Sequence, residues 1–93
     1  MEKDLLDKLE KINKECPLIP HTNAGRMFSM VRRMKAEKEM KIPQEFRSGF
    51  AISVKTGKHT NEMTAEEWKE FYASMVSSLK EQYPELYEQI FKQ

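Results

Sequence analysis

The sequence predicts a small, mainly α-helical single domain, a bundle of three to four helices with one short β segment or hairpin near residues 45–56. Its 93 residues suit one domain spanning residues 1–93, and the 39% that are hydrophobic supply one modest core. Three segments repeat apolar residues at helical spacing, and one stretch alternates with a period of two. The helices therefore account for most of the expected fold.

The first helix is expected over about residues 2–16. Pro17 ends it, because the residue before a proline is pushed out of the α region. Residues 18–20 then read as an extended connector to the next helix. Four residues at helical spacing form the apolar stripe of this first helix: Leu5, Leu9, Ile12 and Cys16.

The second helix is expected from Thr22 or Asn23 to about Lys41. Both starting residues are favourable N-caps, since their side-chain oxygens can accept a free backbone N–H of the first turn. Its apolar stripe consists of Met27, Met30, Val31 and Met34. The opposite face carries arginines.

Residues 42–61 interrupt the helical period. Phe50, Ile52 and Val54 alternate with smaller or polar residues, which predicts a half-buried strand with these three side chains facing the core. A lone strand leaves its backbone unpaired, so it needs a partner. Three partners remain open: a short strand near residues 45–47 in the same chain, a second copy of the chain, or the sheet edge of a binding partner.

The third helix has the clearest start. Thr64 and Glu67 have the spacing of a capping box, and Met63 and Trp68 that of a hydrophobic staple. Pro84 either kinks this helix or begins a short fourth one. The predicted core combines the stripes of the three helices: Leu5, Leu9, Ile12, Met27, Val31, Met34, Trp68, Phe71, Tyr72, Met75 and Leu79.

Aromatic residues are concentrated near the end of the chain, where residues 68–93 hold six of the nine. One straight helix through Pro84 would carry an apolar surface about 200° wide, wider than one core contact needs. The last helix could fold back and bury the excess. Otherwise Tyr87, Ile90 and Phe91 would form a second interface, with a homodimer as one outcome.

The sequence contains no recognisable catalytic or metal-binding set. His21 and His59 both fall in connectors, and Cys16 has no second cysteine or paired histidines to complete a zinc site. We therefore expect a protein that is not an enzyme and that uses no metal or cofactor. A single cysteine and the absence of a long apolar stretch predict a cytoplasmic protein outside the membrane.

Charge is distributed unevenly along the chain. Residues 21–60 have a net charge of +6 and residues 61–93 a net charge of −4, although the whole chain has only +1. Arginine suits the recognition of carboxylates and phosphates. The basic residues could form a solvated face, partly paired with the chain's own acidic third helix, or a patch that binds a partner. The binding patch would consist of Arg26, Arg32, Arg33, Arg47, Lys55 and Lys58.

The sequence thus predicts a small binding protein that contacts an acidic macromolecular surface through the helix face Arg26–Arg33. A protein partner, or a protein–nucleic acid complex, is the first expectation, and nucleic acid bound without strong sequence preference is the alternative. A regulator, inhibitor or adaptor would fit. Regulators of phages and other mobile elements offer a compositional analogy for such a chain.

Overall fold

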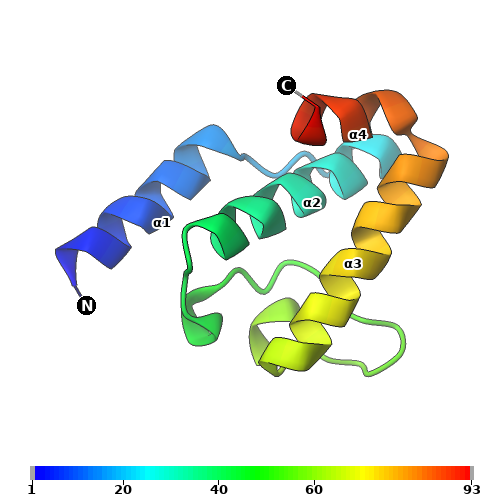
Figure 1. The fold of residues 1–93 in the computed structure, drawn as a ribbon. Coiled ribbons are helices and arrows are strands. Elements are labelled where there is room, and N and C mark those ends of the chain that lie inside the picture. The colour runs from blue at the N-terminus through cyan, green and yellow to red at the C-terminus, as the bar shows by residue number, and fades with distance from the viewer. Residues whose placement is uncertain (1, 93) are drawn as a thin grey trace.

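The computed structural model describes residues 2–92, and the mainly helical fold expected from the sequence is confirmed (Figure 1). Two short 3-10 turns lie in the segment between the second and third helices, at Gln44–Phe46 and Thr60–Glu62. The described residues form four α-helices: α1 (Lys3–Glu15), α2 (Asn23–Glu39), α3 (Ala65–Gln82) and α4 (Pro84–Phe91).

Helix α2 lies at the centre of the arrangement. It contacts each of the other three helices, and α3 also packs against α4. Figure 1 shows α1 along one side of α2, α3 crossing on the other side, and α4 folded back from the end of α3 toward the start of α2. The long connector, residues 40–64, passes between the end of α2 and the start of α3.

The helix starts follow the capping signals in the sequence. The Thr22 hydroxyl accepts the Gly25 N–H at 2.9 Å, which makes Thr22 the N-cap of α2. Thr64 and Glu67 form the expected capping box at the start of α3. Pro84 is the first residue of α4, where its missing N–H leaves no helical bond unmade.

The apolar residues form two clusters, one on each side of α2. The smaller cluster joins α1 to the end of α2 through Ile12, Cys16 and Ile42, with Leu5 and Leu9 packed against it. The larger cluster joins α2, α3 and α4, and its buried members are Val31, Met34, Met63, Trp68, Tyr72, Leu79 and Ile90. The predicted core is thus confirmed but divided.

Helix α4 folds back and partly buries the wide aromatic surface. Ile90 belongs to the larger cluster, and Tyr87 and Phe91 pack against it. The rings of Tyr87 and Phe91 also stack on each other, with 4.8 Å between their centroids. The turn at Tyr83–Pro84 thus gives these three residues neighbours within the chain, as in the alternative in which the last helix folds back. A second interface through Tyr87, Ile90 and Phe91 stays an untested prediction.

The expected β segment near residues 45–56 is also corrected. Residues 2–92 contain no strand, only one antiparallel bridge between Ile52 and His59, and residues 44–46 form a 3-10 turn. The alternation is real, but its direction is reversed: Ala51 and Ser53 are buried, while Ile52 and Val54 face solvent.

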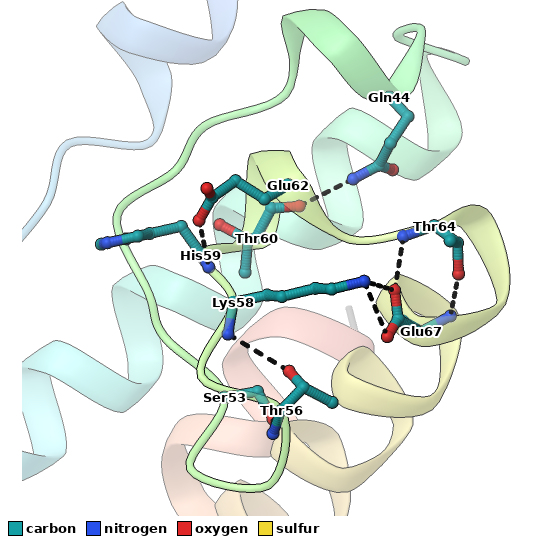
Figure 2. Close-up of polar contacts among 9 residues, drawn as sticks. All are labelled: Gln44, Ser53, Thr56, Lys58, His59, Thr60, Glu62, Thr64 and Glu67. Carbon is teal, nitrogen blue, oxygen red and sulfur yellow. Dashed lines mark hydrogen bonds and ion pairs between the residues drawn. The ribbon is translucent and has the colours of Figure 1, made fainter.

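Close packing explains this reversal. Hydrogen bonds hold the connector to itself on both sides of this segment. The Thr60 hydroxyl donates to the Ser48 carbonyl. The Gln44 amide donates to the Thr60 carbonyl (Figure 2). A Cβ atom at Gly49 would collide with the Asn61 side chain. Ala51 and Ser53 therefore face the neighbouring backbone, Phe50 packs against the larger cluster, and Ile52 and Val54 point outward.

No helix among residues 2–92 has both the length and the apolar character needed to cross a membrane.

Trp68 tests the importance of the larger cluster. It is buried, stacks on Tyr72 with ring centroids 5.4 Å apart, and lies beneath the Arg47 guanidinium. We expect Trp68→Ala to lower the free energy of unfolding by about 3–5 kcal/mol in urea denaturation, because it leaves a large cavity. Lys69→Ala, at the next and exposed position, should change it by less than about 0.5 kcal/mol. A similar effect of both changes would contradict this account of the core.

Candidate functional site

The buried surface of α2 is wider than its methionine stripe. Besides apolar residues, the helix buries Ser29, Arg33 and Glu37. It can do so because α1, α3, α4 and the long connector surround it on most sides. The face that remains exposed is therefore narrower than the sequence predicts.

Arg33 does not lie on the exposed face, so that part of the prediction is wrong. Only 8% of its surface is accessible. One terminal nitrogen donates to the Cys16 carbonyl at 2.8 Å, and the other donates to Asn13 Oδ1 at 2.9 Å and to Ser48 Oγ at 3.0 Å. The arginine fork thus joins the end of α1 to the long connector, because both offer oxygen atoms that need a donor.

Glu37, one turn after Arg33, holds the same connector. It is 1% exposed, and its Oε2 atom accepts the backbone N–H of Ser48 at 2.7 Å. Burial raises the pKa of Glu37 above its ordinary value, although the hydrogen bonds from Ser48 and the nearby charges of Arg33 and Arg47 oppose the shift. We refer to Arg33, Glu37 and Ser48 as the buried polar centre.

Two further residues of the predicted patch are also engaged within the fold. The Arg47 Nε atom donates to the Ile42 carbonyl at 2.8 Å, and its guanidinium lies 4.1 Å from the Trp68 ring centre. Lys58 Nζ lies 2.9 Å from a carboxylate oxygen of Glu67 (Figure 2). Arg47 and Lys58 therefore already make contacts within the fold.

The Glu67 carboxylate links two parts of the fold. It accepts the backbone N–H of Thr64 at 2.9 Å and pairs with Lys58 (Figure 2). These hydrogen bonds, led by the one from Thr64, lower the pKa of Glu67. The pairing of Lys58 with Glu67 thereby holds the turn that precedes Lys58 against the start of α3.

The three remaining basic residues are exposed but separated. Arg26 and Arg32 lie on α2, while Lys55 lies in the turn after Val54. Figure 1 places that turn beside the first half of α3, away from α4 and the end of α1. The six residues predicted from the sequence therefore do not form one continuous patch.

Arg32 lies in a cleft between the end of α1, α2 and α4. The cleft has a volume of about 620 Å³. The Arg32 guanidinium is 6.0 Å from the Phe28 ring centre, and no carboxylate among residues 2–92 forms an ion pair with it. The cleft is lined by Glu15, Cys16, Phe28, Arg32, Lys35, Ala36, Glu39, Gln89 and Ile90.

The chemistry of this cleft favours binding. Lys35 is paired with Glu39 at 3.1 Å, so the two charges largely neutralise each other. Burial raises the pKa of the Cys16 thiol, which keeps it in the less nucleophilic protonated form. No group of three or more metal-ligating side chains occurs within residues 2–92. What remains is a mainly polar cleft to which Cys16, Phe28, Ala36 and Ile90 contribute apolar side chains.

Sequence reasoning missed the cleft because it arises from three helices that are distant along the chain. Arg32 itself was identified, but neither Phe28 nor Lys35 was connected with it. Comparison of the chain with protein-family models, curated proteins and solved structures finds no match. The function is therefore argued from this geometry.

Glu37 provides a test of the buried polar centre. Its raised folded pKa means that its contribution to stability is complete below its ordinary pKa of about 4.5 and is lost as the pH rises through the folded value. Glu37→Gln stays neutral and keeps an oxygen for the Ser48 N–H. We expect the stability of this variant relative to the original protein to rise as the pH increases above about 4.5, by at most about 1.4 kcal/mol for each pH unit, and to level off once the pH has passed the folded pKa.

Urea denaturation at several pH values measures this difference. Glu70→Gln, at an exposed position on α3, controls for the loss of one negative charge. If Glu37→Gln instead lost stability relative to the original protein as the pH rose, the ionised carboxylate would be the stabilising form and our interpretation would be wrong.

Proposed function

We propose that this chain is a small, non-enzymatic binding protein that contacts an acidic protein surface through the exposed side of α2, with Arg32 at the centre of the contact. One observation carries the proposal. Arg32 is an exposed guanidinium above an aromatic ring, with no carboxylate partner among residues 2–92, at the margin of a cleft of about 620 Å³.

The residues around Arg32 support a contact with protein. Phe28 and Ile90 add apolar surface to the cleft, and arginine beside aromatic residues is typical of the energetic centres of protein interfaces. Arginine can also pair with a carboxylate through two parallel hydrogen bonds. A partner with an acidic side chain next to an apolar one would satisfy both parts of the cleft.

The charges of the cleft make nucleic acid the weaker candidate. Two cations line the cleft, and Lys35 is paired with Glu39, so Arg32 is the one described cation there that could meet a phosphate backbone. Arg33, Arg47 and Lys58 make contacts within the fold. Too few free cations are therefore gathered at one place for an interaction that depends on neutralising many phosphates.

A regulator, inhibitor or adaptor that acts in the cytoplasm remains our proposal for the role of this binding. The non-enzymatic part is supported by the side chains that could react. The Cys16 thiol has a raised pKa, and the described contact of the exposed His59 ring is with the Gly49 carbonyl at 3.1 Å. Neither is placed beside a partner that would activate it.

Arg32→Glu tests the proposed contact. We expect it to reduce capture of a specific protein partner from an extract of the source cells by about 10-fold or more, because it replaces the guanidinium with a repelling carboxylate. The thermal midpoint should change little, since the Arg32 side chain is exposed. Lys69→Glu makes the same charge change at an exposed position on α3 and should leave capture intact.

Gel shifts with random duplex and single-stranded oligonucleotides separate the two partner classes. A shift that weakens steeply with salt and is lost in Arg32→Glu would favour nucleic acid over protein. Equal capture by the original protein and Arg32→Glu would exclude the cleft as the contact. Arg33→Glu is not a suitable test, because it would bury a second carboxylate beside Glu37.

A further inference from the structure

The backbone of residues 50–54 is paired along one edge only. The Ser53 N–H donates to the Lys58 carbonyl and the Thr60 N–H donates to the Ala51 carbonyl, each at 2.9 Å. These two bonds enclose the antiparallel bridge between Ile52 and His59. In such a pair the N–H and carbonyl of the enclosed residue point to the opposite side.

The outer edge of this segment is therefore open. The main-chain N–H and carbonyl of Ile52 have no hydrogen-bond partner among residues 2–92. The side chains are exposed as well, since Ile52 is 53% accessible and Val54 is fully accessible. Proteins usually protect such an edge with charged residues, proline or a bulge, so an open edge with two exposed β-branched side chains is unusual.

An apolar pocket continues the edge at its Phe50 end. Phe50 lines a small pocket of about 130 Å³ together with Leu18 and Ile19 from the connector between α1 and α2. Leu18 and Ile19 are themselves exposed apolar residues. An extended chain paired with Ile52 would therefore reach additional apolar surface at this end.

A cation with no ion pair among residues 2–92 lies at each end of this edge. Arg26 lines the pocket beside Phe50, and its described polar contact is with the Pro20 carbonyl at 3.4 Å. Lys55 follows Val54 and has no ion pair within residues 2–92. A second copy of the chain would bring the same two positive charges to the contact, whereas an acidic segment would complement them.

We propose that the outer edge of residues 50–54 binds an extended, acidic segment of a partner protein by strand addition. The segment would have apolar side chains at alternate positions and carboxylates near its ends. Main-chain hydrogen bonds to Ile52 would give the pairing, and Arg26 and Lys55 would select the charge. This surface is separate from the cleft around Arg32.

A synthetic peptide provides the probe. The fluorescein-labelled sequence Glu-Glu-Val-Thr-Val-Thr-Val-Glu-Glu has the required pattern, and replacement of every glutamate by lysine gives the matched control. We expect fluorescence anisotropy to show binding of the acidic peptide below about 1 mM, at least about 10-fold tighter than the lysine peptide. Equal affinity for the two peptides, or no binding of either, would overturn the proposal.

Hydrogen exchange of the Ile52 amide distinguishes strand addition from contact by side chains alone. This amide should exchange rapidly in the free protein and become protected when the acidic peptide binds. The Ser53 amide, already bonded to Lys58, serves as the internal reference. Peptide binding without new protection at Ile52 would contradict the proposed pairing.

Ile52→Pro removes the outward N–H without removing any hydrogen bond described within the chain, so the fold should persist. It should weaken peptide binding about 10-fold or more, while Ile52→Thr, which keeps both the N–H and the β-branch, should weaken it much less. Lys55→Glu, at an exposed position, tests the charge without altering the backbone.

Two controls distinguish strand addition at Ile52 from binding at the cleft and from self-association. Arg32→Glu should leave peptide affinity unchanged, so a failure of the proposed function and a failure of strand addition can be told apart. Light scattering without peptide should show a monomer. A dimer in which the Ile52 amide is already protected would mean that a second copy occupies the edge and would overturn the proposal.

Discussion

The fold depends on the interaction of Arg33 and Glu37 with the backbone around them. Residues 40–64 contain only two short 3-10 turns, so few of their backbone groups are satisfied by regular structure. Glu37 binds the Ser48 N–H, and Arg33 joins the Ser48 side chain to the last turn of α1. Two neighbouring side chains of α2 therefore position both α1 and the long connector.

This use of charge inside the molecule limits what is available outside it. A buried ionic group is costly to remove from water unless it is well paired. Glu37 retains an oxygen, and Arg33 its Nε atom, without a hydrogen-bond partner in the described part of the chain. The basic middle of the sequence thus serves structure to a large extent, and Arg26, Arg32 and Lys55 are the residues of the predicted patch that remain exposed.

The two surfaces that we propose for binding differ in their chemistry. At the cleft, one guanidinium beside Phe28 and Ile90 offers side-chain contacts between three helices. At Ile52, the backbone itself offers the hydrogen bonds. The two surfaces share no lining residue, since the cleft involves the end of α1, α2 and α4, whereas the other follows the connector between α2 and α3.

The sequence by itself determined the helices and their limits, because Thr22, Thr64 and Pro84 act through local backbone geometry. It also determined the core residues of each helix through their spacing. Only the tertiary structure decided whether residues at the margin of an apolar stripe are buried or exposed. Arg33 lies one helical turn after Ser29 and one before Glu37, and all three are buried because neighbouring elements cover that side of α2. The outward orientation of the Ile52 side chain and the cleft around Arg32 likewise depend on contacts between segments that are distant along the chain. The periodicity of apolar residues carries no information about such contacts.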